Sequence, residues 1–294
     1  FSATMPEDVL KLSKAYLEDP VEISAGQRNI GADQVKHVCY SVHEKNRYLA
    51  LKRIVDFNPD LYGIIFCRTR EETKGVAQKL IRDGYQVDAL HGDLSQSQRE
   101  SVMHKFRLKH LHLLTATDVA ARGIDVKDLS HIINYNLPDE TINYLHRSGR
   151  TGRAGQKGIS IAITNLKEHH KIAQIEKLLK KKFELLPVPS GKMICEKRLL
   201  SIVEKLEKTE VDHEEIDPFL PAVYEKLAGL DREDLIKHFI ALEFNQFLDY
   251  YKTADELSVP FEKENARAKK SNKREKTSNR RFQAGAEQGF TRFY

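Results

Sequence analysis

The sequence predicts an α/β protein whose parallel sheet is flanked by helices on both faces. Short apolar runs, such as 62–67 and 111–115, alternate with segments of helical periodicity. Runs of this kind are typical of strands that are buried on both faces, as in parallel sheets. Polar motifs follow several of these runs directly, and ligands of such sheets bind at the carboxyl ends of the strands. We therefore expect a functional site along that edge.

Each element follows from local patterns. Strands are expected at 35–42, 62–67, 86–90, 111–115, 132–136 and 158–163. Helices are expected at 5–16, 44–55, 70–83, 95–106 and 169–183. In the first helix, Thr4 suits the N-cap and Pro6 the first turn.

The character of the chain changes after residue 163. Pro187-Val188-Pro189-Ser190-Gly191 predicts a break, and residues from about 196 to 257 are expected to be helical. Two apolar stripes run along these helices. They consist of Phe219, Leu220, Val223, Tyr224 and Leu227, and of Leu235, Ile236, Phe239, Ile240, Phe244 and Phe247. Because roughly sixty residues of this kind are marginal alone, they form either a small self-contained bundle or a core shared with a second copy.

Composition narrows the classes of function. The chain has 294 residues, 40% of them hydrophobic, and a formal net charge of +5. No apolar run approaches the roughly 20 residues that span a bilayer, so we expect no membrane contact. Cys39, Cys67 and Cys195 lack metal-ligand spacing, so no metal site is expected in this chain, and the sparse count is typical of a reducing cytoplasm. The basic residues of 259–288 predict a disordered tail that is attracted to phosphates.

The segment His146-Arg147-Ser148-Gly149-Arg150-Thr151-Gly152-Arg153 carries most of the functional information. Its three arginines are spaced by three, which places them on one side of a helical turn and the residue just past it. Arginine recognises phosphate and carboxylate groups in a planar, bidentate manner, and the glycines permit close approach. The segment therefore predicts a site for a highly charged anion, with a surface charge cluster as the alternative.

Four further segments occur in a characteristic order. They are Phe1-Ser2-Ala3-Thr4, Gly63-Ile64-Ile65-Phe66-Cys67-Arg68-Thr69-Arg70, Leu90-His91-Gly92-Asp93-Leu94-Ser95-Gln96-Ser97-Gln98-Arg99, and Thr115-Ala116-Thr117-Asp118-Val119-Ala120-Ala121-Arg122-Gly123-Ile124-Asp125-Val126. Together with the arginine segment, they closely resemble the second half of a DEAD-box ATP-dependent RNA helicase over about residues 1–165. One departure is Arg68, which stands where many relatives carry Asn.

The resemblance implies roles for individual residues. Arg150 and Arg153 would be catalytic arginine fingers, and both would bind ATP together with Gly123 and Asp125. RNA would be bound by Arg68, Gly92, Gln96, Arg99 and Thr117. Coupling between two domains would involve Ser2, Thr4, Asp118, His146 and Arg147, with His146 and Arg147 bridging to the other half.

Simpler roles compete with these assignments. Each arginine can form a surface ion pair, worth about 0–1 kcal/mol. Asp125 can serve as a turn or cap residue. Arg99 can pair with Glu100 within its own helix.

Two motifs of an ATPase do not occur in the sequence. There is neither a Gly-x-x-x-x-Gly-Lys-Ser/Thr loop nor an Asp-Glu-Ala-Asp, the parts that hold the phosphates and Mg²⁺. In the family these lie on a preceding RecA-like domain. We therefore expect ATP and Mg²⁺ as cofactors of the whole enzyme, with the Mg²⁺ ligands on that domain, and no ATP turnover by this chain alone.

The resemblance also implies a domain organisation and partners. It assigns 1–30 to the end of motif III and a linker, 31–185 to the second RecA-like domain, 190–258 to a helical extension, 259–288 to a basic linker and 289–294 to the start of an RNA-recognition-like domain. Similar extensions dimerise in some bacterial relatives, so a homodimer through 190–258 is expected beside RNA and the N-terminal domain. The family further suggests ribosome assembly or RNA remodelling in the cytoplasm. Two alternatives stay open: a superfamily 2 DNA helicase, and a non-catalytic dimerising RNA-binding module.

Overall fold

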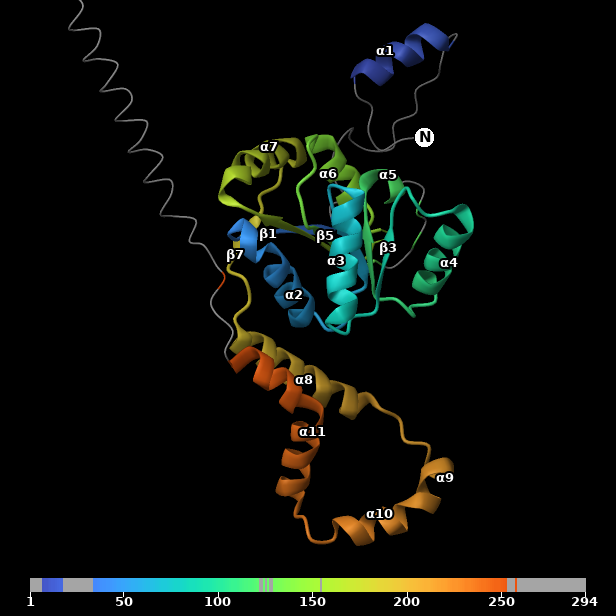
Figure 1. The fold of residues 1–294 in the computed structure, drawn as a ribbon, viewed down its shortest axis with the longest axis vertical. Coiled ribbons are helices and arrows are strands. Elements are labelled where there is room, and N and C mark those ends of the chain that lie inside the picture. The colour runs from blue at the N-terminus through green and yellow to red at the C-terminus, as the bar shows by residue number, and fades with distance from the viewer. Residues whose placement is uncertain are drawn as a thin grey trace, which may run out of the picture.

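The computed structural model describes residues 7–17, 34–121, 124, 126, 129–153, 155–252 and 257. Within these residues the chain forms a seven-stranded sheet in the order β3-β4-β2-β5-β6-β1-β7 (Figure 1). Every neighbouring pair of strands is parallel. The strands are β1 (Val35–Ser41), β2 (Gly63–Phe66), β3 (Val87–Leu90), β4 (Leu113–Ala116), β5 (His131–Asn134), β6 (Gly158–Thr164) and β7 (Glu184–Leu186). The α/β class and the RecA-like parallel sheet expected from the sequence are confirmed.

Helices cover both faces of the sheet. One face is packed by α2 (Arg47–Phe57) and α3 (Arg70–Arg82). The other face is packed by α4 (Gln96–Arg107), α5 (Asp118–Ala121), α6 (Thr141–Ser148) and α7 (His169–Leu179). Neighbouring residues of one strand serve opposite faces: Ile64 packs with α4 and Ile65 with α2 and α3, as a strand period of two requires. The continuous apolar runs are explained by this burial on both sides.

The structure corrects the expected helix at 169–183. Helix α7 ends at Leu179, because Lys180 adopts a left-handed conformation with φ of 54°. The chain then returns as β7, a short strand at the edge of the sheet that pairs with β1. The first two residues of β7, Glu184 and Leu185, are exposed, so no apolar run marks it in the sequence.

Smaller differences occur at two other helices. The expected helix at 44–55 begins as a 3-10 turn (Glu44–Asn46) before α2. Helix α1 (Glu7–Tyr16) agrees with the expected segment at 5–16, whereas Thr4 and Pro6 lie outside the described residues.

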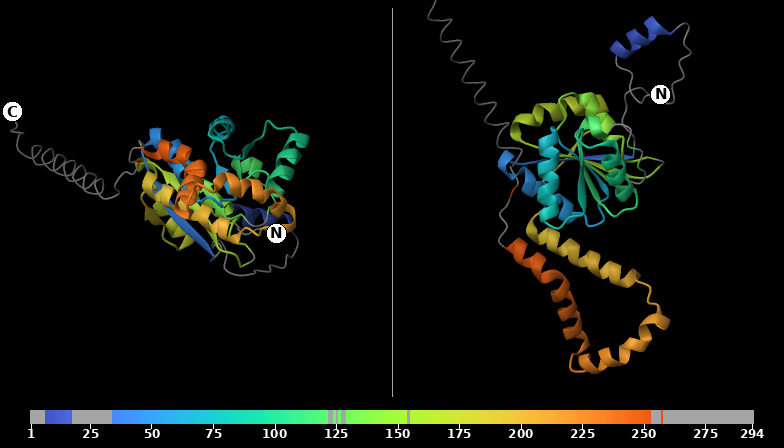
Figure 2. Two further views of the ribbon diagram at one scale, coloured as in Figure 1. Left: turned by 90° about the horizontal axis from the view of Figure 1, so that it is seen from below. Right: turned by 45° about the vertical axis from the view of Figure 1, so that its right-hand side comes forward.

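A helical extension follows the sheet domain. It contains α8 (Gly191–Lys208), α9 (His213–Ile216), a 3-10 turn η3 (Asp217–Phe219), α10 (Leu220–Leu227) and α11 (Arg232–Lys252). The helical character expected for 196–257 is confirmed as far as Lys252, although α8 begins earlier, where the Ser190 hydroxyl accepts a hydrogen bond from the amide of Met193 at 3.3 Å. The right-hand view in Figure 2 shows α8 and the end of α11 beside the sheet domain, with α9 and α10 extending away from it.

The base of the extension is docked on the end of α2. The Lys197 ammonium lies 4.0 Å from the ring centroid of Phe57, and the Tyr251 hydroxyl donates to the buried carboxylate of Asp56. Phe57 closes α2 immediately before β2, so the extension sits at the amino edge of the sheet. Among the described residues no helix is both long and apolar enough to cross a membrane.

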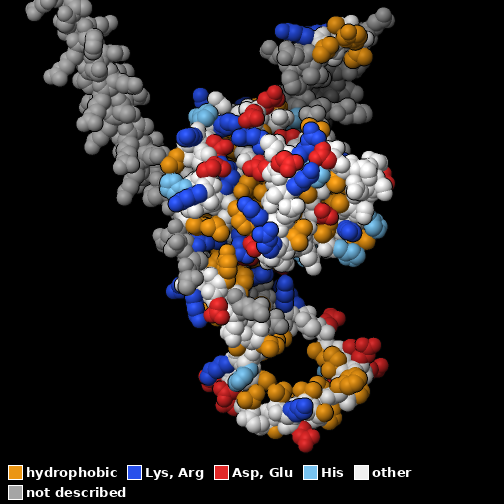
Figure 3. All heavy atoms as spheres, viewed as in Figure 1, with side chains coloured by type: hydrophobic (Ala, Val, Ile, Leu, Met, Phe, Trp, Pro, Cys, Tyr) orange, Lys and Arg blue, Asp and Glu red, His pale blue; other side chains and the backbone are white. Residues whose placement is uncertain are grey.

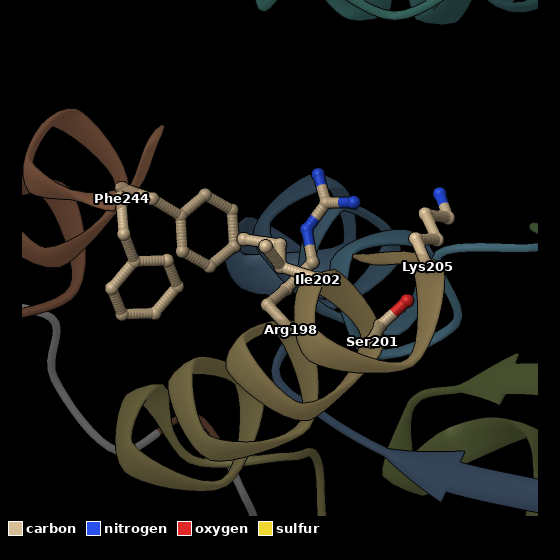
Figure 4. A pocket seen from close by; sticks show the side chains of 6 residues that line it. Arg198, Ser201, Ile202, Lys205 and Phe244 are labelled. Atoms are coloured by element: carbon tan, nitrogen blue, oxygen red, sulfur yellow. The ribbon is translucent and has the colours of Figure 1, made fainter. Parts of the chain in front are cut away.

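Helices α8 and α11 also enclose a pocket of about 190 Å³ (Figure 4). Arg198, Ser201, Ile202 and Lys205 line it from α8, and Phe244 and Phe247 line it from α11. The Arg198 guanidinium lies 5.1 Å from the ring centroid of Phe247. This contact joins only the second half of α11 to α8.

Candidate ATP and RNA site

The predicted site residues gather at the carboxyl edge of the sheet. Arg68 follows β2, Gly92 follows β3 and Thr117 follows β4, and Asn136, which was not predicted, follows β5. Because these strands are parallel neighbours, their ends lie side by side. Ser2, Thr4, Gly123 and Asp125 lie outside the described residues, so the structure places no contact on them.

Arg147 is the centre of this edge and is only 2% exposed. Its Nε and Nη2 donate to the two carboxylate oxygens of Asp118 at 2.6 and 2.7 Å. Its Nη1 donates to the Asn134 side chain at 3.0 Å and to the Asn136 carbonyl at 2.7 Å. The expectation that Arg147 bridges to another half is therefore wrong, because its guanidinium is engaged within its own domain. Asp118 is thereby held within the domain by Arg147 of α6.

The three arginines do not converge on one side. Arg147 lies in the last turn of α6 and points inward, with its guanidinium 4.9 Å from the ring centroid of Phe66. Arg150 and Arg153 lie beyond the end of α6. His146 lies on the last turn of α6 and is exposed. The buried Arg147 therefore has a structural role, whereas Arg150 and Arg153 lie on the turn that follows the helix.

That turn depends on Gly152. Its φ is +68°, and a Cβ there would lie 2.6 Å from the Val35 Cγ2 atom, so a side chain is excluded on both grounds. Arg150 donates to the Ile124 carbonyl at 2.8 Å, and Arg153 donates to the Gly149 carbonyl at 2.8 Å. The turn thus holds the Arg150 guanidinium beside Ile124 in the loop that follows α5, whereas the Arg153 guanidinium bonds the end of α6.

Arg68 is fixed through its backbone. Its amide donates to Glu72 Oε2 at 3.0 Å and to Asn136 Oδ1 at 3.1 Å. Its half-exposed guanidinium lies 3.6 Å from Glu168 and 4.0 Å from Asp139. Sequence reasoning identified Arg68 but none of these four partners.

Glu168 is itself held by Arg47, a second buried arginine that sequence reasoning missed. Arg47 is 2% exposed and donates to Glu168 at 2.8 Å and to both oxygens of Glu44 at 2.7 and 2.8 Å. It also donates to the carbonyl of Tyr135, just after β5, and to that of Ile163, the next-to-last residue of β6. Hydrogen bonding by Arg47 lowers the pKa of Glu44. The only sequence signal is a Glu three residues before an Arg at a helix start, which is too common to be diagnostic.

The remaining predicted RNA residues lie on α4 and α5. Helix α4 begins with a capping box of Ser95 and Gln98, which exposes Gln96 on its first turn. Gln96 donates to Glu100 at 2.7 Å, whereas Arg99 donates to the Ala120 carbonyl at 2.7 Å. Glu100 is thus the partner of Gln96. Arg99 ties α4 to α5.

Thr117 caps α5, because its hydroxyl accepts from the Ala120 amide at 3.4 Å. Gly92 is exposed, and a Cβ there would meet only the Arg70 side chain, at 3.8 Å. Beside it, Asp93 binds Arg70 and Lys74, the latter at 2.9 Å. The hydrogen bond from Lys74, followed by that from Arg70, lowers the pKa of Asp93 to about 2. The surface around Gly92 is open, and the charge of Asp93 there is compensated by Arg70 and Lys74.

No group of three or more His, Cys, Asp or Glu side chains in the described part of the chain is arranged to hold a metal ion. The cationic, glycine-containing edge is suited instead to an anion, with guanidinium groups on the turn after α6 and along α3 and α4. Together with the RecA-like sheet, such an edge agrees with the helicase C-terminal domain that the sequence resembles.

Comparison with known proteins agrees with that class. Residues 46–155 match the helicase conserved C-terminal domain, and residues 194–252 match the helical domain of a probable ATP-dependent RNA helicase. The chain is similar to the ATP-dependent RNA helicase DbpA of Bacillus subtilis, with 36% identity over 76% of this chain and 47% of that protein. The fold is also similar to a DEAD box protein from Methanococcus jannaschii, with 45% identity, a TM-score of 0.51, and coverage of 63% of this chain and 50% of that one.

A third similar protein is S. cerevisiae Dbp5 bound to RNA and ADP BeF3. It is 28% identical, with a TM-score of 0.60, over 71% of this chain and 54% of that chain. The chain therefore contains the C-terminal domain of DEAD-box RNA helicases followed by a helicase helical domain. It spans about half the length of the curated relatives it matches.

Proposed function

We propose that the protein containing this chain is an ATP-dependent RNA helicase, in which these residues supply one side of the ATP site and part of the RNA track. The observation that supports this most directly is the pair formed by the buried Arg147 and the partly buried Asp118. It joins α5 to α6, and it thereby sets the turn that carries Arg150 and Arg153 beside the loop after α5. The relatives are ATP-dependent RNA helicases, and one similar structure contains RNA.

In this proposal Arg150 and Arg153 act as arginine fingers toward ATP. Guanidinium groups on a fixed turn can stabilise the charge that develops on a transferred phosphoryl group. Gly123 and Asp125 would complete the contacts to the nucleotide, and His146, Ser2 and Thr4 would contact the N-terminal domain. Mg²⁺ and the phosphate loop would belong to that domain. Because the site is divided in this way, turnover requires the two domains to close.

The RNA track in this proposal runs along Arg68, Gly92, Gln96, Arg99 and Thr117 at the same edge. Arginine and glutamine donate to phosphate oxygens, and an exposed glycine allows the strand to approach closely. Contacts of this kind position RNA without reading its sequence. The proposal includes remodelling of short RNA duplexes, such as those of assembling ribosomes, in the cytoplasm.

Replacement of Arg150 tests the proposal. In the full-length protein, Arg150→Ala should lower RNA-stimulated ATP turnover by about 10³-fold or more, the value of an arginine finger, while ATP binding changes little. The control is Arg82→Ala, since Arg82 is an exposed arginine at the opposite end of α3. Turnover and equilibrium ATP binding would be measured for both variants.

Each outcome has a distinct reading. Unchanged turnover in Arg150→Ala would reduce Arg150 to a surface charge and reject the proposal for this residue. Stimulation by single-stranded DNA as strong as by RNA would favour the DNA helicase. Salt-sensitive RNA binding by the full-length protein with no ATP turnover would favour the non-catalytic RNA-binding module.

The helical extension supports a second proposal, that this chain forms a homodimer through 190–258. No side chain of α9, η3 or α10 is buried. Phe219 is 73% exposed and Tyr224 is 64% exposed, and the first half of α11 exposes Ile236 and Phe239. Figure 3 shows hydrophobic side chains around the opening within the extension. A self-contained bundle is therefore not observed, and an apolar face of this extent is typical of a protein interface.

Sedimentation tests the dimer. The full-length protein should sediment as a dimer at micromolar concentration, and Phe219→Asp with Phe239→Asp should shift it to a monomer, because carboxylates cannot be buried unpaired. Lys226→Glu on α10 is the control, since it alters charge but removes no apolar contact. A wild-type protein that sediments as a monomer would exclude this proposal without affecting the first.

A further inference from the structure

Asn136 joins two parts of the site that sequence patterns treat as separate motifs. It lies near the start of the loop after β5 and is only 6% exposed. The Oδ1 atom accepts a hydrogen bond from the Arg68 amide at 3.1 Å, and the Nδ2 atom donates to Glu72 Oε1 at 3.1 Å. The carbonyl of the same residue accepts from Arg147 Nη1 at 2.7 Å.

Glu72 closes this arrangement into a ring. Its second oxygen also accepts from the Arg68 amide, at 3.0 Å, so Arg68 is held by two acceptors that are bonded to each other. Glu72 lies on the first turn of α3, where its own amide donates to the hydroxyl of the N-cap residue Thr69 at 3.1 Å. The backbone from Arg68 to Glu72 is thereby fixed relative to Asn136.

The other side of Asn136 leads to the arginine turn. Arg147 connects the Asn136 carbonyl to Asp118, and Arg147 precedes the turn that carries Arg150 and Arg153. A continuous path of hydrogen bonds thus runs from Asp118 through Arg147 and Asn136 to Arg68. It crosses the ends of β4, β5 and β2, and side-chain networks of this kind can act as units.

We propose that Asn136 is a positioning residue that couples ATP binding at the arginine turn to RNA binding at Arg68. This inference rests on the proposed function, because the two ligands are assigned there. The position requires a side chain with both a donor and an acceptor. Asp would keep the acceptor for Arg68 but would place a second carboxylate against Glu72, and Ala would lose both bonds.

The test is the coupling between two ligands in the full-length protein. The affinity for a non-hydrolysable ATP analogue is measured with and without a saturating uridine oligoribonucleotide, and the ratio of the two affinities is the coupling factor. By linkage, the analogue must change the affinity for RNA by the same factor. The variants are Asn136→Ala and Glu72→Gln, the second of which keeps the size of the side chain. Asn58→Ala is the control, because Asn58 Nδ2 bonds only the end of α2, at 2.7 Å to the Ile54 carbonyl.

Both site variants should lower the coupling factor by about fivefold or more, as expected when a buried hydrogen bond is lost, whereas the control should not. Binding of the analogue alone should stay within about twofold of wild type, since the Asn136 carbonyl still holds Arg147 in both variants. A merely structural role would weaken binding of each ligand alone and leave the ratio unchanged.

Two negative outcomes can be told apart. If wild type shows coupling and both variants couple equally well, the role of Asn136 is overturned while the proposed function stands. If wild type itself shows no coupling and no RNA-stimulated turnover, the proposed function fails, and this inference fails with it.

Discussion

The sheet domain and the helical extension obtain their stability in different ways. In the sheet domain every helix except the short turns buries an apolar face, and three clusters of buried residues fill both sides of the sheet. In the extension α8 buries only Ile194, and α9 and α10 bury nothing. Both regions have helical, amphipathic sequences, so periodicity alone does not show whether an apolar stripe finds its partner in the same chain.

The sheet domain also has polar groups in its core. In the extension such groups occur mainly at the base. Arg147 and Arg47 are both buried and fully surrounded by acceptors. Such groups determine how the loops at the carboxyl edge are arranged. Removal of one partner is expected to lower the stability of the fold strongly. Polar networks therefore mark the part of the molecule whose geometry matters for function.

The largest expected effect comes from Arg147. Arg147→Ala should destabilise the sheet domain by about 3–5 kcal/mol, because Asp118 and the Asn136 carbonyl lose their partner. Denaturant unfolding of this chain measures it, with the exposed Arg82→Ala as control, expected within about 0.5 kcal/mol. The double variant Asp118→Ala/Arg147→Ala should recover part of the loss, since no unpaired carboxylate remains. A loss below about 1 kcal/mol would place Arg147 among surface pairs.

A second effect concerns pH and two buried histidines. Burial, followed by the charge of Lys181, lowers the pKa of His37 to about 4, and burial followed by Lys197 lowers that of His131 to about 4. The unfolded chain binds these protons near pH 6.5 and the folded domain does so only near pH 4. Stability is therefore fully present above pH 6.5 and should fall as pH drops toward 4, by up to about 3 kcal/mol for each histidine.

This is checked by measuring unfolding midpoints between pH 7.5 and 4 and taking the slope of the midpoint against pH. His37→Phe should flatten the slope while the exposed His104→Phe leaves it unchanged. The Nε2 atoms of both buried histidines have no hydrogen-bond partner, which is consistent with their neutral form. An unchanged slope in His37→Phe would show that the pKa of His37 is the same in the folded and the unfolded chain.

The third effect tests how the two regions are joined. Tyr251→Phe removes the hydroxyl that donates to Asp56, while Tyr85 still bonds that carboxylate at 2.5 Å. We expect a loss of about 1–3 kcal/mol in the docking of α11, as for a buried acceptor that loses one donor. Hydrogen exchange of the second half of α11 measures it. Tyr250→Phe is the matched control, because its ring contact with Lys52 is kept; equal protection in both variants would count against a docking role.

The sequence predicted most of the sheet domain because apolar runs and turn residues act locally. Runs such as 62–67 appear as strands with shifts of a residue or two at their ends, and the polar residues after them do gather at one edge. The exposed strand β7 was missed because its pairing with β1, rather than its own composition, creates it.

The site was predictable in its residue types more than in its geometry. Arg147 and Arg150 are alike in sequence, but one points into the core and the other lies beyond the helix end. Arg47 and Asn136 were missed because their roles depend on carbonyls and side chains contributed by distant strands. Spacing shows which groups share a segment, whereas the acceptors that fix them come from the assembled sheet.

The smallest expected effect separates the two regions most clearly. Phe219→Ala should change the unfolding free energy of the monomer by no more than about 0.5 kcal/mol, because an exposed ring loses no packing. Phe106→Ala, in the closed core of the sheet domain, should cost about 3–5 kcal/mol. Both are measured at a protein concentration low enough to keep the chain monomeric. If the cost of Phe219→Ala then grows as the concentration is raised, mass action identifies a second copy as the partner of the exposed stripe. A cost near that of Phe106→Ala at every concentration would instead mean that the extension closes its own core in solution.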